Sequence, residues 1–83
     1  GKVVFTGSHG SYGNMIIIKH SNNIKTYYGH LSKNIIIKVG DKIKKGQKIA
    51  SIGNSGRSTG PHLHYEISQN DIPINPRKFI LLE

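Results

Sequence analysis

Residues 60–66 read GPHLHYE, with His62 and His64 separated by a single leucine. Residues two apart on a β-strand point to the same face and lie about 7 Å apart, so these two imidazoles would project together. Neutral imidazole is a common zinc ligand and titrates near neutral pH, so such a pair can hold a metal ion or move protons. Two surface histidines can share this spacing as well, and an isolated H-x-H motif does not decide between these alternatives.

Further residues could extend this pair. Glu66 follows at the same two-residue spacing, and an H-x-H-x-E strand offers three potential ligands on one face. A position at the edge of the site, or a pairing with lysine, is the simpler interpretation of Glu66. His30 lies in the stretch YYGHL, where Gly29 allows a close approach of backbone or substrate. We interpret His9 and His20, in the turn-like stretches GSHGSYG and KHSNN, as exposed.

The loop before the pair, GNSGRSTGP at residues 53–61, is rich in glycine and hydroxyl side chains. It lacks the G-K-[ST] ending of a phosphate-binding loop, and it precedes a strand rather than a helix N-terminus. A loop that allows close backbone approach beside a histidine-bearing strand suits an extended peptide substrate better.

The chain that positions these residues is short and basic. Its 83 residues form at most one small domain, and the absence of cysteine excludes both disulfides and a thiolate metal site. Twelve Lys and Arg against four Asp and Glu give a net charge of +8, which favours an anionic partner. The basic residues are scattered, and we interpret them as solvated strand and turn positions. No apolar run approaches the length of a transmembrane segment.

Short strands joined by tight turns must position the histidines, because glycine and β-branched residues are frequent and no segment keeps a helical period. We predict an all-β domain with one sheet system, and strands near residues 2–6, 14–20, 24–30, 35–38, 48–53 and 62–68. The polar SNN at 21–23 predicts a hairpin over 14–30. Two prolines in the tail DIPINPRKFILLE restrict it to extended or turn conformations.

Four stretches occur in an order typical of a known family: YGNMIIIKH, TYYGHLS, KVGDKIKKGQKIASIGNSGRSTG and GPHLHYEI. Together they resemble the C-terminal part of lysostaphin-type (LytM-like) zinc metallopeptidases, which are peptidoglycan endopeptidases with the duplicated hybrid motif fold. The resemblance covers nearly the whole chain. We therefore expect residues 1–83 to form the C-terminal part of a single catalytic domain that is N-terminally incomplete.

The resemblance also implies roles for individual residues. His64 matches the family's zinc ligand, and His62 and His30 match its two catalytic histidines. In such enzymes the zinc polarises the scissile carbonyl and activates a water, while the histidines handle protons and oxyanion charge. The substrates are peptide cross-links or stem peptides of bacterial peptidoglycan, which implies a periplasmic or extracellular location in the cell envelope. An anionic cell wall would also attract a chain with a net charge of +8.

One departure from the family pattern affects the metal. The family takes its other two zinc ligands from an upstream H-x-x-x-D segment, and this chain begins after the position where that segment should lie. His9 cannot replace it, because no acid follows at the needed spacing. We expect these residues alone to hold zinc poorly and to be inactive. The N-terminal remainder of the domain is then the expected partner, both for the metal and for an exposed sheet edge.

Three alternatives to an enzyme remain. The first is a catalytically inactive lysostaphin-like scaffold that binds peptidoglycan or activates a cell-wall amidase; the presence of three imidazoles in one groove favours the enzyme instead. The stretch VGDKIKKGQKIASIG suggests a lipoyl- or biotinyl-like carrier, but the lysine-bearing turn of such carriers is missing. A nucleic-acid partner is not expected, because four Tyr and two Phe are too few to alternate with basic residues on an exposed face.

Overall fold

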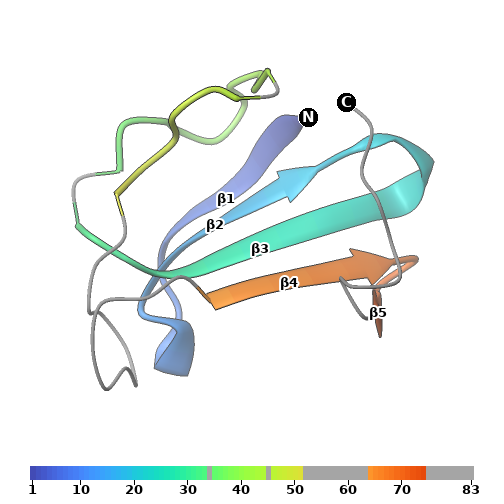
Figure 1. The fold of residues 1–83 in the computed structure, drawn as a ribbon, viewed down its shortest axis with the longest axis horizontal. Helices are drawn as coiled ribbons and strands as arrows, with labels where there is room; N and C mark the ends of the chain where they lie inside the picture. The colour runs from blue at the N-terminus through green and yellow to red at the C-terminus, as the bar shows by residue number, and fades with distance from the viewer. Residues whose placement is uncertain (34, 45, 52–63, 75–83) are drawn as a thin grey trace.

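The computed structural model describes residues 1–33, 35–44, 46–51 and 64–74. Within these ranges five strands form one antiparallel sheet in chain order (Figure 1). They are β1 (Lys2–Ser8), β2 (Asn14–Lys19), β3 (Ile24–Leu31), β4 (His64–Gln69) and β5 (Ile72–Ile74). Short 3₁₀ turns at Gly10–Tyr12 and Ser21–Asn23 join β1 to β2 and β2 to β3. The prediction of an all-β fold with one sheet is confirmed, and no helix in the described ranges is long and apolar enough to cross a membrane.

Strands β1 to β4 lie where strands were predicted, and β2 and β3 form the predicted hairpin around SNN. The prediction of strands at 35–38 and 48–53 is wrong for residues 35–38 and 48–51, which lie outside strands. There the backbone is joined by isolated hydrogen bonds, from Ser32 N to Ser51 O and from Ile36 N to Ile49 O, rather than by a ladder. Residues 52–53 and 62–63 of the predicted strands lie outside the described residues. Part of the tail forms β5, which pairs with β4.

The hydrophobic core lies on one face of the sheet. Its buried members come from three strands and the segment after β3: Val3, Ile16, Ile18, Leu31 and Ile37. Partly buried side chains of the 35–50 segment pack against them: Ile35, Ile43, Ile49 and Ala50. In Figure 1 this segment, coloured green to yellow, runs beside β1 and β2. Burial on this face therefore explains Ile16 and Ile18 of the first isoleucine run and Ile35 and Ile37 of the second.

The outer edge of β1 is covered at its beginning. Val3 N donates to Asp41 O and Gly40 N donates to Val3 O, both at 2.9 Å. The N-terminal amino group donates to Ile43 O at 2.9 Å. The expectation of an exposed sheet edge is therefore wrong for residues 1–3, because the segment after β3 folds back and pairs with them.

The opposite face of the sheet is the one that bears His64. Side chains alternate along a strand, so His64, Glu66 and Ser68 of β4 project to the same side. We call this side the site face and define it by these three residues.

Candidate active site

His30 occupies a bulge in β3 that turns its side chain onto the site face. The register with β2 shifts by one residue between Tyr28 and Leu31, and His30 has φ of +57°. Regular alternation would send His30 to the core face along with Tyr28. Instead Leu31 joins the core, and the His30 ring lies 5.5 Å from the His64 ring at 90°. A bulge that re-aims a side chain is common beside active sites, as is a left-handed conformation in a residue other than glycine.

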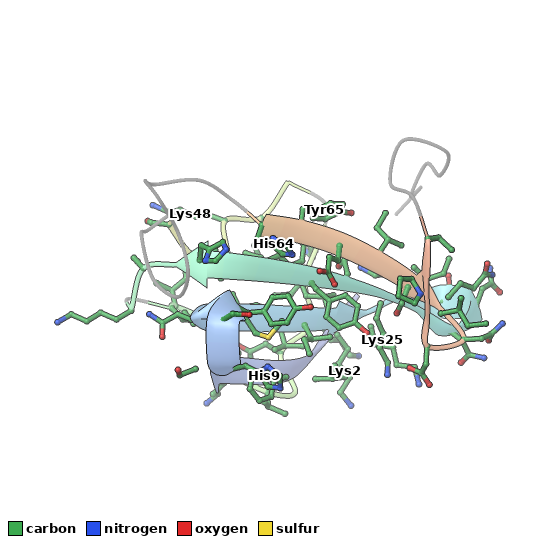
Figure 2. All side chains as sticks on the ribbon, turned by 90° about the horizontal axis from the view of Figure 1, so that it is seen from below. Lys2, His9, Lys25, Lys48, His64 and Tyr65 are labelled. Carbon is green, nitrogen blue, oxygen red and sulfur yellow. The ribbon has the colours of Figure 1, made fainter. Side chains whose placement is uncertain are left out.

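His64 is held by a carboxylate two residues along its own strand. Its Nε2 lies 2.7 Å from Oε1 of Glu66, and both side chains are a little over one-third exposed. An ionised carboxylate only accepts hydrogen bonds, so Nε2 is the protonated nitrogen and donates to Glu66. The lone pair of neutral His64 is therefore on Nδ1. In Figure 2, His64 is labelled beside the ribbons of β3 and β4.

Tyr12, from the turn between β1 and β2, completes this arrangement. Its hydroxyl donates to the Glu66 carboxylate, at 3.1 Å from Oε1 and 3.2 Å from Oε2. Its ring also lies edge-on to His64, with centroids 5.3 Å apart. Burial raises the pKa of Tyr12, and the hydrogen bond to Glu66 raises it further. Tyr12 therefore remains a protonated donor at neutral pH, and Glu66 accepts from both sides.

Gly29 allows these groups to approach one another. It lies opposite His64 in the register of β3 and β4. A Cβ added at Gly29 would lie 3.3 Å from His64 Cβ, 3.3 Å from the Tyr12 carbonyl oxygen and 3.4 Å from Tyr12 Cδ1. The expected close approach at Gly29 is therefore made by Tyr12 and His64.

Replacing Gly29 with alanine should displace Tyr12 and His64 by a few tenths of an ångström, because the added methyl group meets backbone as well as side-chain atoms. Such overpacking is expected to lower the free energy of unfolding by about 1–3 kcal/mol. Urea denaturation of Gly29→Ala beside the unmodified protein measures this change. Unaltered stability would show that the space above Gly29 is not tightly packed.

The remaining described histidines take no part in the hydrogen bond that orients His64, although the His9 ring lies 5.9 Å from the Tyr12 ring. His9 is exposed, as predicted, and its ring lies edge-on to Phe5 at 5.9 Å. The prediction that His20 is exposed is wrong, since His20 is half-buried and its Nε2 lies 2.8 Å from Oγ1 of Thr26. Thr26 is fully buried, and a buried hydroxyl requires a hydrogen-bond partner. His20 therefore has a structural role.

Comparison with known proteins places the chain in a family. The model of peptidase family M23 matches residues 1–76. The chain belongs to peptidase family M23. The resemblance to lysostaphin-type peptidases inferred from the sequence is thereby confirmed.

Three M23-like proteins show how much of a complete protein this chain represents. The peptidoglycan DD-endopeptidase ShyA of Vibrio cholerae is 49% identical over 78 residues, which cover 94% of this chain and 18% of ShyA. A zinc-containing peptidase from Vibrio cholerae superimposes with a TM-score of 0.82 and 44% identity, covering 89% of this chain and 22% of that one. The catalytic domain of the antimicrobial peptidase lysostaphin from Staphylococcus simulans superimposes with a TM-score of 0.85 and 36% identity, covering 94% and 62%. The chain thus spans less than two thirds of each of these proteins.

In the described part of this M23 chain, one imidazole, that of His64, is oriented to bind a metal ion, but a complete metal site is not present. The described residues contain no group of three or more His, Cys, Asp or Glu that could hold a metal ion. His64 fits as a single ligand, because metal-binding histidines are usually oriented by a carboxylate or carbonyl on their other nitrogen. His62 and the loop 53–61 lie outside the described residues, so the role implied for His62 stays a prediction.

Proposed function

We propose that the protein containing this chain is a zinc-dependent endopeptidase that hydrolyses peptide cross-links or stem peptides of bacterial peptidoglycan. The observation that carries the proposal is the oriented His64 beside His30 on one face of an M23 sheet. The DD-endopeptidase ShyA supports peptidoglycan as the substrate class. An enzyme with this substrate acts in the cell envelope, in the periplasm or outside the cell.

In this proposal His64 binds zinc through Nδ1, and the other ligands are a His and an Asp of an H-x-x-x-D segment elsewhere in the full-length protein. Zinc, when bound, polarises the scissile carbonyl and lowers the pKa of water. His30 and His62 transfer protons and stabilise charge on the carbonyl oxygen. In this proposal the peptide binds against the site face, because His64 projects from that face.

Glu66 and Tyr12 are positioning residues in this proposal. The carboxylate fixes the proton of His64 on Nε2 and keeps Nδ1 available for the metal. The Tyr12 hydroxyl fixes the carboxylate in turn. Neither residue needs to touch the substrate, since both act through the orientation of His64.

Glu66→Ala should weaken zinc binding by the full-length protein about 10–100-fold, the usual effect of removing a carboxylate that orients a metal-binding histidine. Tyr12→Phe keeps the ring contact with His64 and should have a smaller effect. Chelator competition measures the zinc affinity, and ¹⁵N NMR of the His64 ring shows whether the proton stays on Nε2. Equal zinc affinity and an unchanged His64 tautomer in Glu66→Ala would contradict the positioning role.

The function itself is tested with the full-length protein. We expect bound zinc after dialysis against metal-free buffer, and release of cross-link-derived muropeptides from purified peptidoglycan that stops when zinc is removed by a chelator. A protein that binds peptidoglycan without zinc and releases nothing would overturn the enzyme proposal. The scaffold interpretation would then explain the chain.

A further inference from the structure

The sheet register gathers four lysines from separate parts of the chain into one row. Lys2 of β1 pairs with Lys19 of β2, and Lys19 pairs with Lys25 of β3. On its other side Lys2 forms an isolated bridge with Lys42. Directly opposite residues of antiparallel strands project to the same face about 5 Å apart. We call Lys42, Lys2, Lys19 and Lys25 the lysine row.

The lysine row is unfavourable for the fold by itself. Like charges directly opposite one another destabilise a sheet. Lys25 Nζ lies 3.0 Å from Asp71 Oδ1, which raises the pKa of Lys25. Across the described ranges, Lys2, Lys19 and Lys42 form no ion pair. Three ammonium groups are therefore left to attract an anion from solution.

A hollow of about 310 Å³ adjoins the end of the row formed by Lys19 and Lys25. Its lining combines two lysines of the row with polar residues of the two adjacent turns: Lys19, Lys25, Asn23, Asn70 and Asp71. Asn23 Nδ2 donates to Asn70 Oδ1 at 3.2 Å, which joins the two turns. Two ammonium groups, two amide groups and the Asp71 carboxylate, which is paired with Lys25, thus border a space large enough for a carboxylate, and Lys19 is the lysine of the hollow without an ion pair in the described ranges.

The lysine row lies on the site face. Lys25 is opposite Ser68, and Ser68 is four residues beyond His64 on β4. At about 3.3 Å per residue, the row lies about 13 Å from His64 along the strand, a distance that about four residues of an extended peptide span. In Figure 2, Lys25 and Lys2 lie toward the end of the sheet where β3 begins, farther along the sheet than His64.

Glu66 separates His64 from the lysine row and constrains what can lie there. A ligand along this path must be uncharged beside Glu66 and anionic at the row. A peptide with a carboxylate about four residues from the bond at His64 meets this requirement. A nucleic acid carries a phosphate at every step and would place one against Glu66.

We propose that the lysine row binds the carboxylates of an acidic peptide that lies extended along the site face from His64. The proposal rests on the proposed function, because this peptide is the substrate of that site. It specifies the substrate further: an acidic group about four residues from the scissile bond strengthens binding. The row thereby selects for acidic wall peptides over uncharged ones.

The test uses the full-length protein carrying His64→Ala, so that binding is measured without cleavage. Fluorescence anisotropy follows a labelled pentapeptide, three alanines followed by two glutamates, at low and at physiological salt. Lys2→Gln with Lys19→Gln, which removes two lysines of the row that have no ion pair in the described ranges, should weaken binding about tenfold, as expected for losing charged hydrogen-bond donors. The matched pair Lys33→Gln with Lys48→Gln removes the same charge from exposed positions outside the row and should change binding less than about twofold.

Three results would overturn the proposal. An equal loss in the matched pair would show that only the net charge attracts the peptide. Equal binding of a peptide with glutamines in place of the glutamates would remove the role of the carboxylates. Tighter binding of labelled oligothymidine than of the acidic peptide would assign the row to nucleic acid. Thermal denaturation of both double variants controls for unfolding, and because no readout depends on zinc or cleavage, a failure of the proposed enzyme activity remains distinguishable.

Discussion

His64→Ala in the full-length protein is expected to abolish zinc retention and peptidoglycan hydrolysis together. A catalytic zinc site normally needs three protein ligands, and this substitution removes the imidazole whose Nδ1 is left free by Glu66. If zinc acts as proposed, its loss would remove both carbonyl polarisation and the activated water, so kcat/KM should fall at least about a thousandfold. Atomic emission spectroscopy after dialysis measures zinc, and chromatography of released muropeptides measures hydrolysis.

His9→Ala is the matched control, because it removes an exposed imidazole that contacts Tyr12 only by ring packing, with centroids 5.9 Å apart, and takes no part in the hydrogen bonds of His64 and Glu66. It should retain both zinc and activity. Thermal denaturation of the metal-free proteins separates metal loss from unfolding, since both variants should unfold close to the unmodified protein. A His64→Ala protein that keeps its zinc would contradict the ligand role.

The class of fold and the principal hairpin could be predicted because their determinants are local. The runs before and after SNN are strongly β-prone, and the polar turn between them fixes their antiparallel pairing. Glu66 follows His64 by two residues, and this spacing likewise predicts that both side chains lie on the same face of the strand. The hydrogen bond between them confirms this prediction. Local pattern failed where burial explains the residues, as in Ile35 and Ile37, which pack on the core without joining a strand.

The rest of the site depends on contacts between distant segments. Tyr12 was not identified as part of the site, and only the structure shows that its turn brings the hydroxyl to Glu66, 54 residues away. The sequence shows Gly29 beside His30, but not that the register shifts there and redirects the imidazole. His20 has a turn-like sequence context, yet the buried hydroxyl of Thr26 holds it.

The lysine row shows the same limit for charge. Lys2, Lys19, Lys25 and Lys42 are dispersed along the sequence, where their spacing indicates only solvated positions. Cross-strand pairing places them side by side on the face that bears His64. A property of the surface therefore arises from register, which one residue of slippage would change completely.

Replacement of His30 should lower hydrolysis while leaving zinc in place, because His30 lies beside His64 but is proposed to act on protons rather than to bind metal. We expect kcat/KM to fall about 10²–10⁴-fold, the range typical of losing a general acid or base. Alanine is a poor choice for this test, since φ of +57° strains a residue with a Cβ. His30→Asn and His30→Gly are better, because asparagine tolerates and glycine favours the left-handed conformation.

The two substitutions together separate chemistry from backbone strain. If His30 serves proton transfer, both variants remain folded and keep their zinc, with a lower Tm because a buried ring is lost, and both lose activity, since neither side chain titrates near neutral pH. If His30 only shapes the bulge, His30→Gly should be as active as the unmodified protein, because glycine adopts this conformation without strain. Zinc content, thermal denaturation and the pH profile of kcat/KM for the three proteins decide between these outcomes. A pH profile that keeps its shape in His30→Asn would assign the proton transfer to another group.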